Sequence, residues 1–180
     1  MSTPVSAFQP VQGTPVLLQQ LFLASPAWLP EAEDLGEGRW SMRVRGGGVP
    51  RQVVARVGEP WTAGTTLWRA LSWDPVEPDE DERGSARLAE RLLPSFDGEL
   101  GIDLREGASS LVLDGRYQPP GGRFGAALDS VALHRLARST AQRLLGDVAV
   151  GLMERASAVE AAGDLGAHGT GPADSAEGGQ

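Results

Sequence analysis

Few side chains in this 180-residue sequence have the chemistry expected of a catalytic site. The sequence contains no Cys and no Lys, which excludes a thiol nucleophile, a thiolate metal site and a Schiff base. His134 is the one histidine in the region expected to fold, since His168 falls in a polar tail. It could act as a general acid or base, or it could be a residue at the boundary of the core. Because one histidine leaves only scattered carboxylates as ligands, we expect no metal site.

Two further polar side chains fall on expected inward faces of strands. Tyr117 ends a run of alternating apolar residues, where its hydroxyl could contact a ligand or donate to a backbone carbonyl. Arg69 shares a strand face with Leu67 and Leu71. It is either a buried cation that requires a partner, such as a ligand carboxylate, or a guanidinium that reaches water along a twisted strand. With His134, these two residues are the candidates for polarising a substrate carbonyl.

The formal net charge of −8 is unevenly distributed. Residues 74–83 hold six acids and one Arg, and residues 156–180 hold four acids and no base. Pro75 and Pro78 interrupt the first stretch, whose spacing does not match a calcium loop, so we interpret it as a solvated acidic loop. A nearly neutral body with acidic appendages has no basic face for phosphates, and nucleic acid is therefore not an expected partner.

The two ends of the sequence differ from the middle in composition. The apolar run near the N-terminus has no basic segment before it and is interrupted by Gln19 and Gln20. We therefore expect neither a secretory signal nor a membrane span, and a cytoplasmic protein is the default. Residues 1–12 are expected to be a loose leader. Residues 159–180, rich in Gly, Ala and acids, are expected to be disordered, which leaves one domain over residues 13–158.

Alternating apolar and polar residues predict short antiparallel strands before a long helix. In residues 39–45 every apolar residue is at an even position and every charged residue is at an odd one, which predicts a strand with one solvated face. Further strands are expected at about 51–57 and 64–73. Residues 15–24 could supply an edge strand, and residues 25–31 a short helix with a proline at its first position.

Strict alternation over residues 96–104 and 111–117 predicts a hairpin. The inward faces can meet only if paired residue numbers sum to 213 or to 215. The first register sets Glu99 against Asp114, whereas the second sets Glu99 against Arg116. Because opposed like charges are unfavourable, we expect the second register.

The C-terminal part has a helical period. One stripe, opposite a polar face, contains Leu133, Ala137, Ala141, Leu144 and Val148. A helix over about residues 123–158 would be too long to lie beside one strand and must cross the sheet. The predicted fold class is therefore α+β, with a curved antiparallel sheet wrapped around a long C-terminal helix.

The order of these elements resembles the helix-grip fold of the SRPBCC superfamily, which includes START-like, polyketide cyclase-like and lipid-transfer relatives. Residues 111–129 carry most of the likeness, with a last strand and a Pro-Gly elbow at 119–122. His134, Arg135 and residues 138–140 follow in the helix. Members bind lipids, polyketides, hormones or other apolar molecules between sheet and helix, and some are cyclases or dehydratases. The resemblance implies such a cavity but transfers no catalytic residue.

Three hypotheses follow for the function. We expect first that the domain binds an apolar small molecule or lipid between sheet and helix, without a cofactor, and that it is a binding protein rather than an enzyme. The alternatives are a cyclase or dehydratase acting on a polyketide-like substrate, and an adaptor with a filled core. Small Ala137 and Ala141, opposite Gly115, are expected to leave space. The side chains expected to line the cavity are Trp40, Met42, Arg69, Leu100, Ile102, Leu111, Leu113, Tyr117, Leu133, His134, Ala137, Ala141, Leu144 and Val148.

Overall fold

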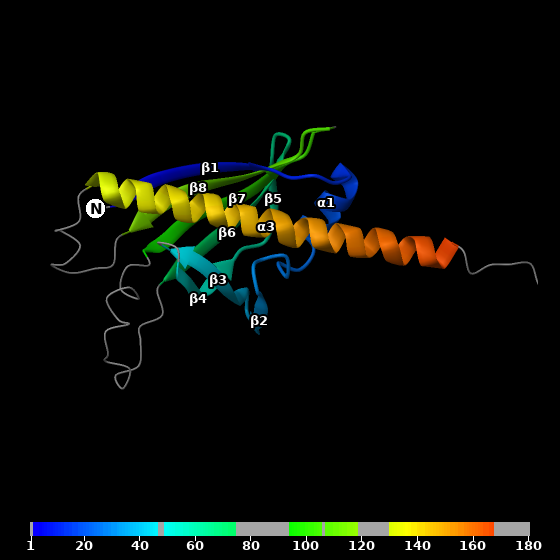
Figure 1. Ribbon diagram of the computed structural model, residues 1–180, viewed down its shortest axis with the longest axis horizontal. Coiled ribbons are helices and arrows are strands. Elements are labelled where there is room, and N and C mark those ends of the chain that lie inside the picture. Colours follow the sequence, from blue (N-terminus) through cyan, green and yellow to red (C-terminus); the bar gives the residue numbers. More distant parts are fainter. Residues whose placement is uncertain (1, 47–48, 75–93, 106, 119–129, 168–180) are drawn as a thin grey trace, which may run out of the picture.

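A computed structural model describes residues 2–46, 49–74, 94–105, 107–118 and 130–167. Over these residues the chain forms an antiparallel sheet and two helices (Figure 1). The elements, in chain order, are β1 (Thr3–Pro10), α1 (Pro15–Leu23), β2 (Glu33–Gly36), β3 (Arg39–Gly46), β4 (Val49–Val57), β5 (Trp61–Ala63), β6 (Thr66–Asp74), β7 (Ser95–Asp103), β8 (Ser110–Gln118) and α3 (Ser130–Ala167).

The sheet is curved, and α3 packs across its inner face. The strand order is β1-β8-β7-β6-β4-β3-β2, with β5 paired to β6. Helix α3 contacts both β1 and β3, which lie toward opposite ends of this order, and it crosses the sheet in Figure 1. Its 38 residues span about 57 Å at 1.5 Å per residue, so its C-terminal turns extend beyond the sheet. The predicted helix-grip arrangement of the α+β class is confirmed.

The core lies between the sheet and α3, as the alternation predicts. In β3 the even-numbered side chains Trp40, Met42 and Val44 are buried, while the odd-numbered ones are solvated to different degrees. Helix α3 contributes Ala141, Leu145 and other residues of its apolar stripe. These side chains form one contiguous cluster. A period of two on the strands and of 3.6 on the helix therefore located the buried faces correctly.

The N-terminal region differs from the prediction in three places. Residues 3–10 are not a loose leader but form β1, which pairs with β8 along its whole length. Residues 15–23 form α1 rather than an edge strand, and residues 25–31 form turns rather than a helix. Leu18 and Phe22, one helical turn apart, are both fully buried on the inner face of α1.

The hairpin of β7 and β8 adopts the register that we did not favour. Glu99 lies opposite Asp114, so paired numbers sum to 213. In this register Gly98 lies opposite Gly115, and the Phe96 ring packs over both glycines. Burying a phenylalanine contributes roughly 1.5–3 kcal/mol, whereas opposed like charges cost only about 0.2–1 kcal/mol. The preferred register of 215 was wrong because aromatic packing outweighs charge pairing on the solvated face.

Helix α3 extends further toward the C-terminus than the sequence predicts. The helix continues to Ala167, so the tail expected to be disordered from residue 159 is helical as far as 167. The predicted helix start at 123, the elbow at 119–122 and residues 168–180 lie outside the described residues. The acidic stretch 74–83 also lies outside them, except for Asp74 at the end of β6.

Candidate functional site

The structure brings most of the predicted cavity residues together. Leu133 lies in α3, but its side chain is outside the described part. His134 is exposed, so it does not face the interior and its place in the cavity was wrong. The others are buried, and all of these except Arg69 belong to one apolar cluster: Trp40, Met42, Leu100, Ile102, Leu111, Leu113, Tyr117, Ala137, Ala141, Leu144 and Val148.

Three aromatic rings pack together on the inner face of β6, β7 and β8. The ring centroid of Phe96 lies 4.6 Å from that of Trp73 and 5.1 Å from that of Tyr117. The indole nitrogen of Trp73 donates to the Pro94 carbonyl at 3.2 Å. Phe96 also occupies the space over Gly115, since a β-carbon there would lie 2.7 Å from its ring. The space expected over Gly115 is therefore filled by Phe96.

Two hydroxyl groups lie in this interior without a hydrogen-bond partner among the residues that the structure describes. They are the Tyr117 phenol on β8 and Oγ1 of Thr140 on α3, in residues that are 2% and 0% exposed. The neighbouring Ser139, by contrast, is exposed and donates to the Leu136 carbonyl at 3.0 Å. An unmade hydrogen bond at a buried polar group costs about 1–3 kcal/mol. A polar atom of a ligand or a water molecule would supply the missing hydrogen bond.

Sequence reasoning named Tyr117 as a site residue but missed Thr140. Ala137, three residues before Thr140, and Leu144, four residues after it, are both buried on the same face of α3. A threonine within an otherwise apolar stripe was the signal that could have identified it.

Alkaline titration gives a direct check on the Tyr117 environment. Tyr117 is the single tyrosine of a chain without lysine, and burial raises the pKa of its phenol above the ordinary value. The unfolded chain ionises near pH 10 whereas the folded protein does not, so the stabilisation is complete below about pH 10 and is lost as the pH rises further. We expect tyrosinate absorbance and circular dichroism to change in one transition. Ionisation near pH 10 with native dichroism would show instead that the phenol reaches solvent.

Arg69 is a buried cation whose partners are backbone carbonyls. Its residue is 5% exposed. Nε donates to the carbonyl of Phe22 at 3.0 Å, and Nη2 donates to those of Leu23 and Ala24 at 2.9 and 2.7 Å. Nη1 donates to the Gly58 carbonyl at 3.0 Å. Desolvation by burial lowers the pKa of this guanidinium, but hydrogen bonding to the end of α1 compensates the charge.

This geometry decides between the two interpretations of Arg69. The side chain is buried, so the interpretation in which it reaches water was wrong. Its partner is nevertheless the C-terminal end of α1 and not a ligand carboxylate. Four of its five N–H groups are already used. Arg69 therefore anchors α1 to the sheet, and its place in the predicted ligand cavity was wrong.

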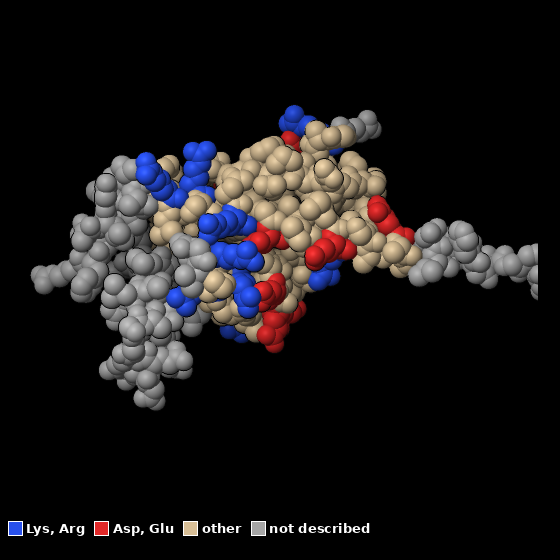
Figure 2. All heavy atoms as spheres, in the orientation of Figure 1, with Lys and Arg blue, Asp and Glu red and all other residues tan. Residues whose placement is uncertain are grey.

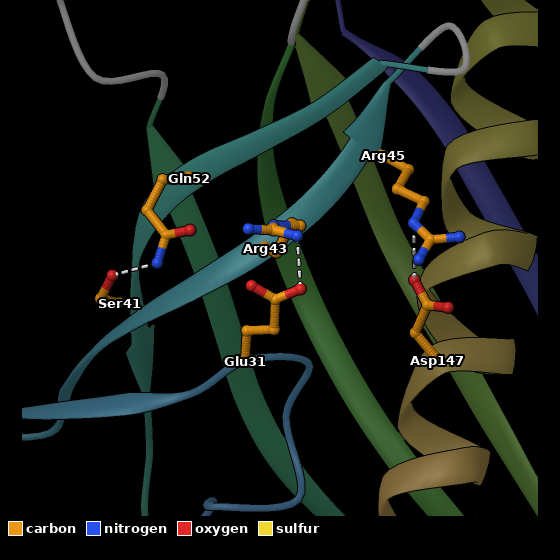
Figure 3. Close-up of polar contacts among 6 residues, drawn as sticks. All are labelled: Glu31, Ser41, Arg43, Arg45, Gln52 and Asp147. Atoms are coloured by element: carbon orange, nitrogen blue, oxygen red, sulfur yellow. Dashed lines mark hydrogen bonds and ion pairs between the residues drawn. The ribbon is translucent and has the colours of Figure 1, made fainter.

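A groove of about 670 Å³ runs beside α3, where the helix faces β3 and the segment 27–32. Figure 2 shows basic and acidic side chains next to one another over this face of the molecule. In Figure 3, Arg43 of β3 reaches Glu31 at 2.5 Å, and Arg45 reaches Asp147 of α3 at 3.7 Å. Exposed ion pairs of this kind are worth about 0–1 kcal/mol each.

The charges of the groove serve the fold rather than recognition. Besides these ion pairs, Arg155 of α3 donates to the Ala27 carbonyl at 2.8 Å. The contacts fasten α3 and the segment 27–32 to β3, and they neutralise most of the charge within the groove. Among the residues that the structure describes, there is no group of three or more His, Cys, Asp or Glu side chains placed to hold a metal ion.

Comparisons with known proteins place the chain by its shape only. No family model and no curated protein matches the sequence. Among solved structures, the chain is similar to that of Ara h 8.0201, a Bet v 1-like protein, with a TM-score of 0.49 and 10% sequence identity. The superposition covers 86% of this chain and 99% of that one. Within the described residues, neither helix combines the length and apolar character needed to cross a membrane.

Proposed function

We propose that the domain binds an apolar small molecule or lipid between the sheet and α3, with one polar group of that molecule hydrogen-bonded to Tyr117 and Thr140. The observation that carries this proposal is the pair of buried hydroxyls without partners in an apolar interior. They belong to β8 and α3, which contact each other. The resemblance of residues 111–129 to the SRPBCC superfamily, whose members bind apolar molecules in this place, points the same way.

A carbonyl or hydroxyl oxygen of a bound molecule would supply the hydrogen-bond partner that the hydroxyls of Tyr117 and Thr140 lack. Phenylalanine and valine have nearly the same shapes as tyrosine and threonine and would pack in a sealed core without an unmade hydrogen bond. Tyrosine and threonine are preferable here only where a bound molecule forms a hydrogen bond with their hydroxyls. Because burial keeps the phenol of Tyr117 neutral, this group can donate to a ligand oxygen.

The same observations favour binding over catalysis. A cyclase or dehydratase needs a group that accepts a proton from the substrate as well as one that polarises its carbonyl. Of the three candidates, His134 is exposed, and Arg69 already donates four of its five N–H groups to backbone carbonyls. Tyr117 is left in the interior, and because burial raises its pKa the phenol stays protonated and cannot accept a proton. The domain is therefore proposed as a carrier or sensor of its ligand.

The experiment compares Tyr117→Phe and Thr140→Val with the wild type. Without ligand, each variant should raise the free energy of unfolding by about 1 kcal/mol, because an unpaired buried hydroxyl is removed. With ligand, affinity should fall about tenfold, the loss of roughly one hydrogen bond. Unfolding is followed in urea. Binding is followed by native mass spectrometry for a co-purifying molecule and by titration with a fluorescent long-chain fatty acid.

Ser139→Ala is the matched control, since it removes an exposed hydroxyl from the residue next to Thr140. It should change neither stability nor binding appreciably. A wild-type protein that carries no small molecule and does not bind the fatty acid would refute the proposal. That result would favour the adaptor with a filled core, for which Phe96 over Gly98 and Gly115 is the relevant packing.

A further inference from the structure

A second hollow, of about 530 Å³, lies on the opposite side of the sheet from α3. Besides the acid Glu37, its walls include Arg39 of β3, Arg56 of β4 and Ser72 of β6. These side chains point outward, because their neighbours along each strand, such as Trp40 and Ala55, are buried on the inner face. The hollow therefore opens away from the interior between sheet and helix, and Val57 is a core residue that also lines it.

The strand register places the three polar residues in one row. Arg39 pairs with Arg56, and Arg56 pairs with Ser72. Side chains directly opposite each other on one face of a sheet lie about 4.5–5.5 Å apart at their β-carbons. Two guanidinium groups and a hydroxyl can thus converge on a single small group.

Small residues form the floor beneath this row. Gly38, Gly58 and Ala70 line it, and none carries a side chain longer than a methyl group. Gly38 has a φ of +70°, which favours glycine. Backbone hydrogen bonds from Val57 to Gly38 at 2.8 Å and from Gly58 to Ala70 at 2.9 Å fix the floor. The hollow is therefore a fixed feature of the backbone.

Two arginines and one acid, Glu37, line the hollow, so its lining has a net positive charge, and Asp97 lies opposite Ser72 at the next position of the row. Like charges directly opposite each other destabilise a sheet, yet Arg39 faces Arg56. Neither Arg56 nor Ser72 has a side-chain hydrogen bond or ion pair with any residue in the described ranges. Arg39 has one ion pair, with Glu37 at 4.0 Å, whose side chain is 89% exposed. Such a distant and exposed pair contributes little.

We propose that this hollow binds a tetrahedral oxyanion of the phosphate type, held by Arg39, Arg56 and the hydroxyl of Ser72. Arginine forms paired hydrogen bonds to phosphate oxygens, and a dianion between two guanidinium groups turns their mutual repulsion into attraction. A planar carboxylate carries one charge and fewer acceptor directions, so it is the weaker ligand. The anion is either inorganic phosphate or the phosphate group of an organic molecule.

The test is a titration of the full chain, labelled with ¹⁵N, followed by the amide signals of Gly38, Gly58 and Ala70. The probes are inorganic phosphate, phenyl phosphate and acetate. We expect saturable shifts with both phosphates and weaker binding of acetate. Tighter binding of phenyl phosphate identifies an organic phosphate, whereas equal binding identifies the free anion. Both outcomes support the site.

Arg56→Gln should weaken phosphate binding at least about tenfold, since one of the two guanidinium groups is lost. Arg138→Gln is the matched control, because Arg138 is exposed on α3 and its side chain has no polar partner within the described residues. It removes the same charge away from the hollow and should leave the affinity unchanged. Shifts that do not saturate, or equal losses in the two variants, would overturn the proposal. A native amide spectrum of Arg56→Gln verifies that its exposed side chain was not needed for folding.

Discussion

Arg69→Met is expected to lower the free energy of unfolding by about 4 kcal/mol, within the range for removing one partner of a buried charged group. Methionine fills much of the same volume but donates no hydrogen bond. The carbonyls of Phe22, Leu23, Ala24 and Gly58 would be left without their present donor. Each buried acceptor without a partner costs about 1–3 kcal/mol, less where water replaces the lost donor.

Urea unfolding measures this loss, and hydrogen exchange locates it. Amides of α1 should lose protection first, because Arg69 is the connection between the end of α1 and the sheet. Arg116→Met, at an exposed position on β8, is the matched control and should stay within about 0.5 kcal/mol of the wild type. A loss below about 1 kcal/mol for Arg69→Met would mean that water satisfies these carbonyls and that α1 does not depend on the guanidinium.

Gly115→Ala should destabilise the domain by about 3 kcal/mol, the upper part of the range for overpacking a core. The added β-carbon would lie 2.7 Å from the Asp97 carbonyl oxygen and from the Phe96 ring. Backbone of the neighbouring strand cannot withdraw without breaking the pairing of β7 and β8. Phe96 would have to move, which disturbs its stacking on Trp73 at 4.6 Å.

A glycine-to-alanine substitution in α3 should instead stabilise the domain. A β-carbon on Gly146 meets nothing within 4 Å, and glycine within a helix is less favourable than alanine by about 1 kcal/mol. Gly146→Ala should therefore raise the free energy of unfolding by roughly this amount. Thermal and urea unfolding of the two variants measure the contrast. Equal effects at the two positions would show that Phe96 does not pack closely on Gly115.

The two expected results concern different parts of the interior. Arg69 fixes α1 beside the sheet, whereas the contact of Phe96 with Gly98 and Gly115 positions the aromatic cluster that contains Tyr117. Displacing Phe96 would also change the surroundings of the Tyr117 hydroxyl. Ligand binding, if measured on Gly115→Ala, is therefore a sensitive reporter of the proposed site.

The sequence alone predicts which face of each strand and helix is buried. Alternation in residues 39–45 and the helical stripe of α3 correctly identified which side chains are buried, and Arg69 lies on the inward face that its neighbours indicated. The hairpin of residues 96–104 and 111–117 was also predicted, and its even-numbered residues do pair with odd-numbered ones. These features are local, because a segment with one buried face must repeat its apolar residues with the period of its own backbone.

Tertiary structure decided which of these faces meet and what each polar group contacts. Arg69 hydrogen-bonds to Phe22, which lies 47 positions away, and the register of 213 depends on packing of Phe96 over two glycines. Residues 3–10, and not residues 15–24, supply the edge strand beside β8, and residues 15–23 form α1. The row of Arg39, Arg56 and Ser72 arose only when three strands paired. Periodicity does not encode such outcomes, since they depend on competition between segments that are distant in the chain.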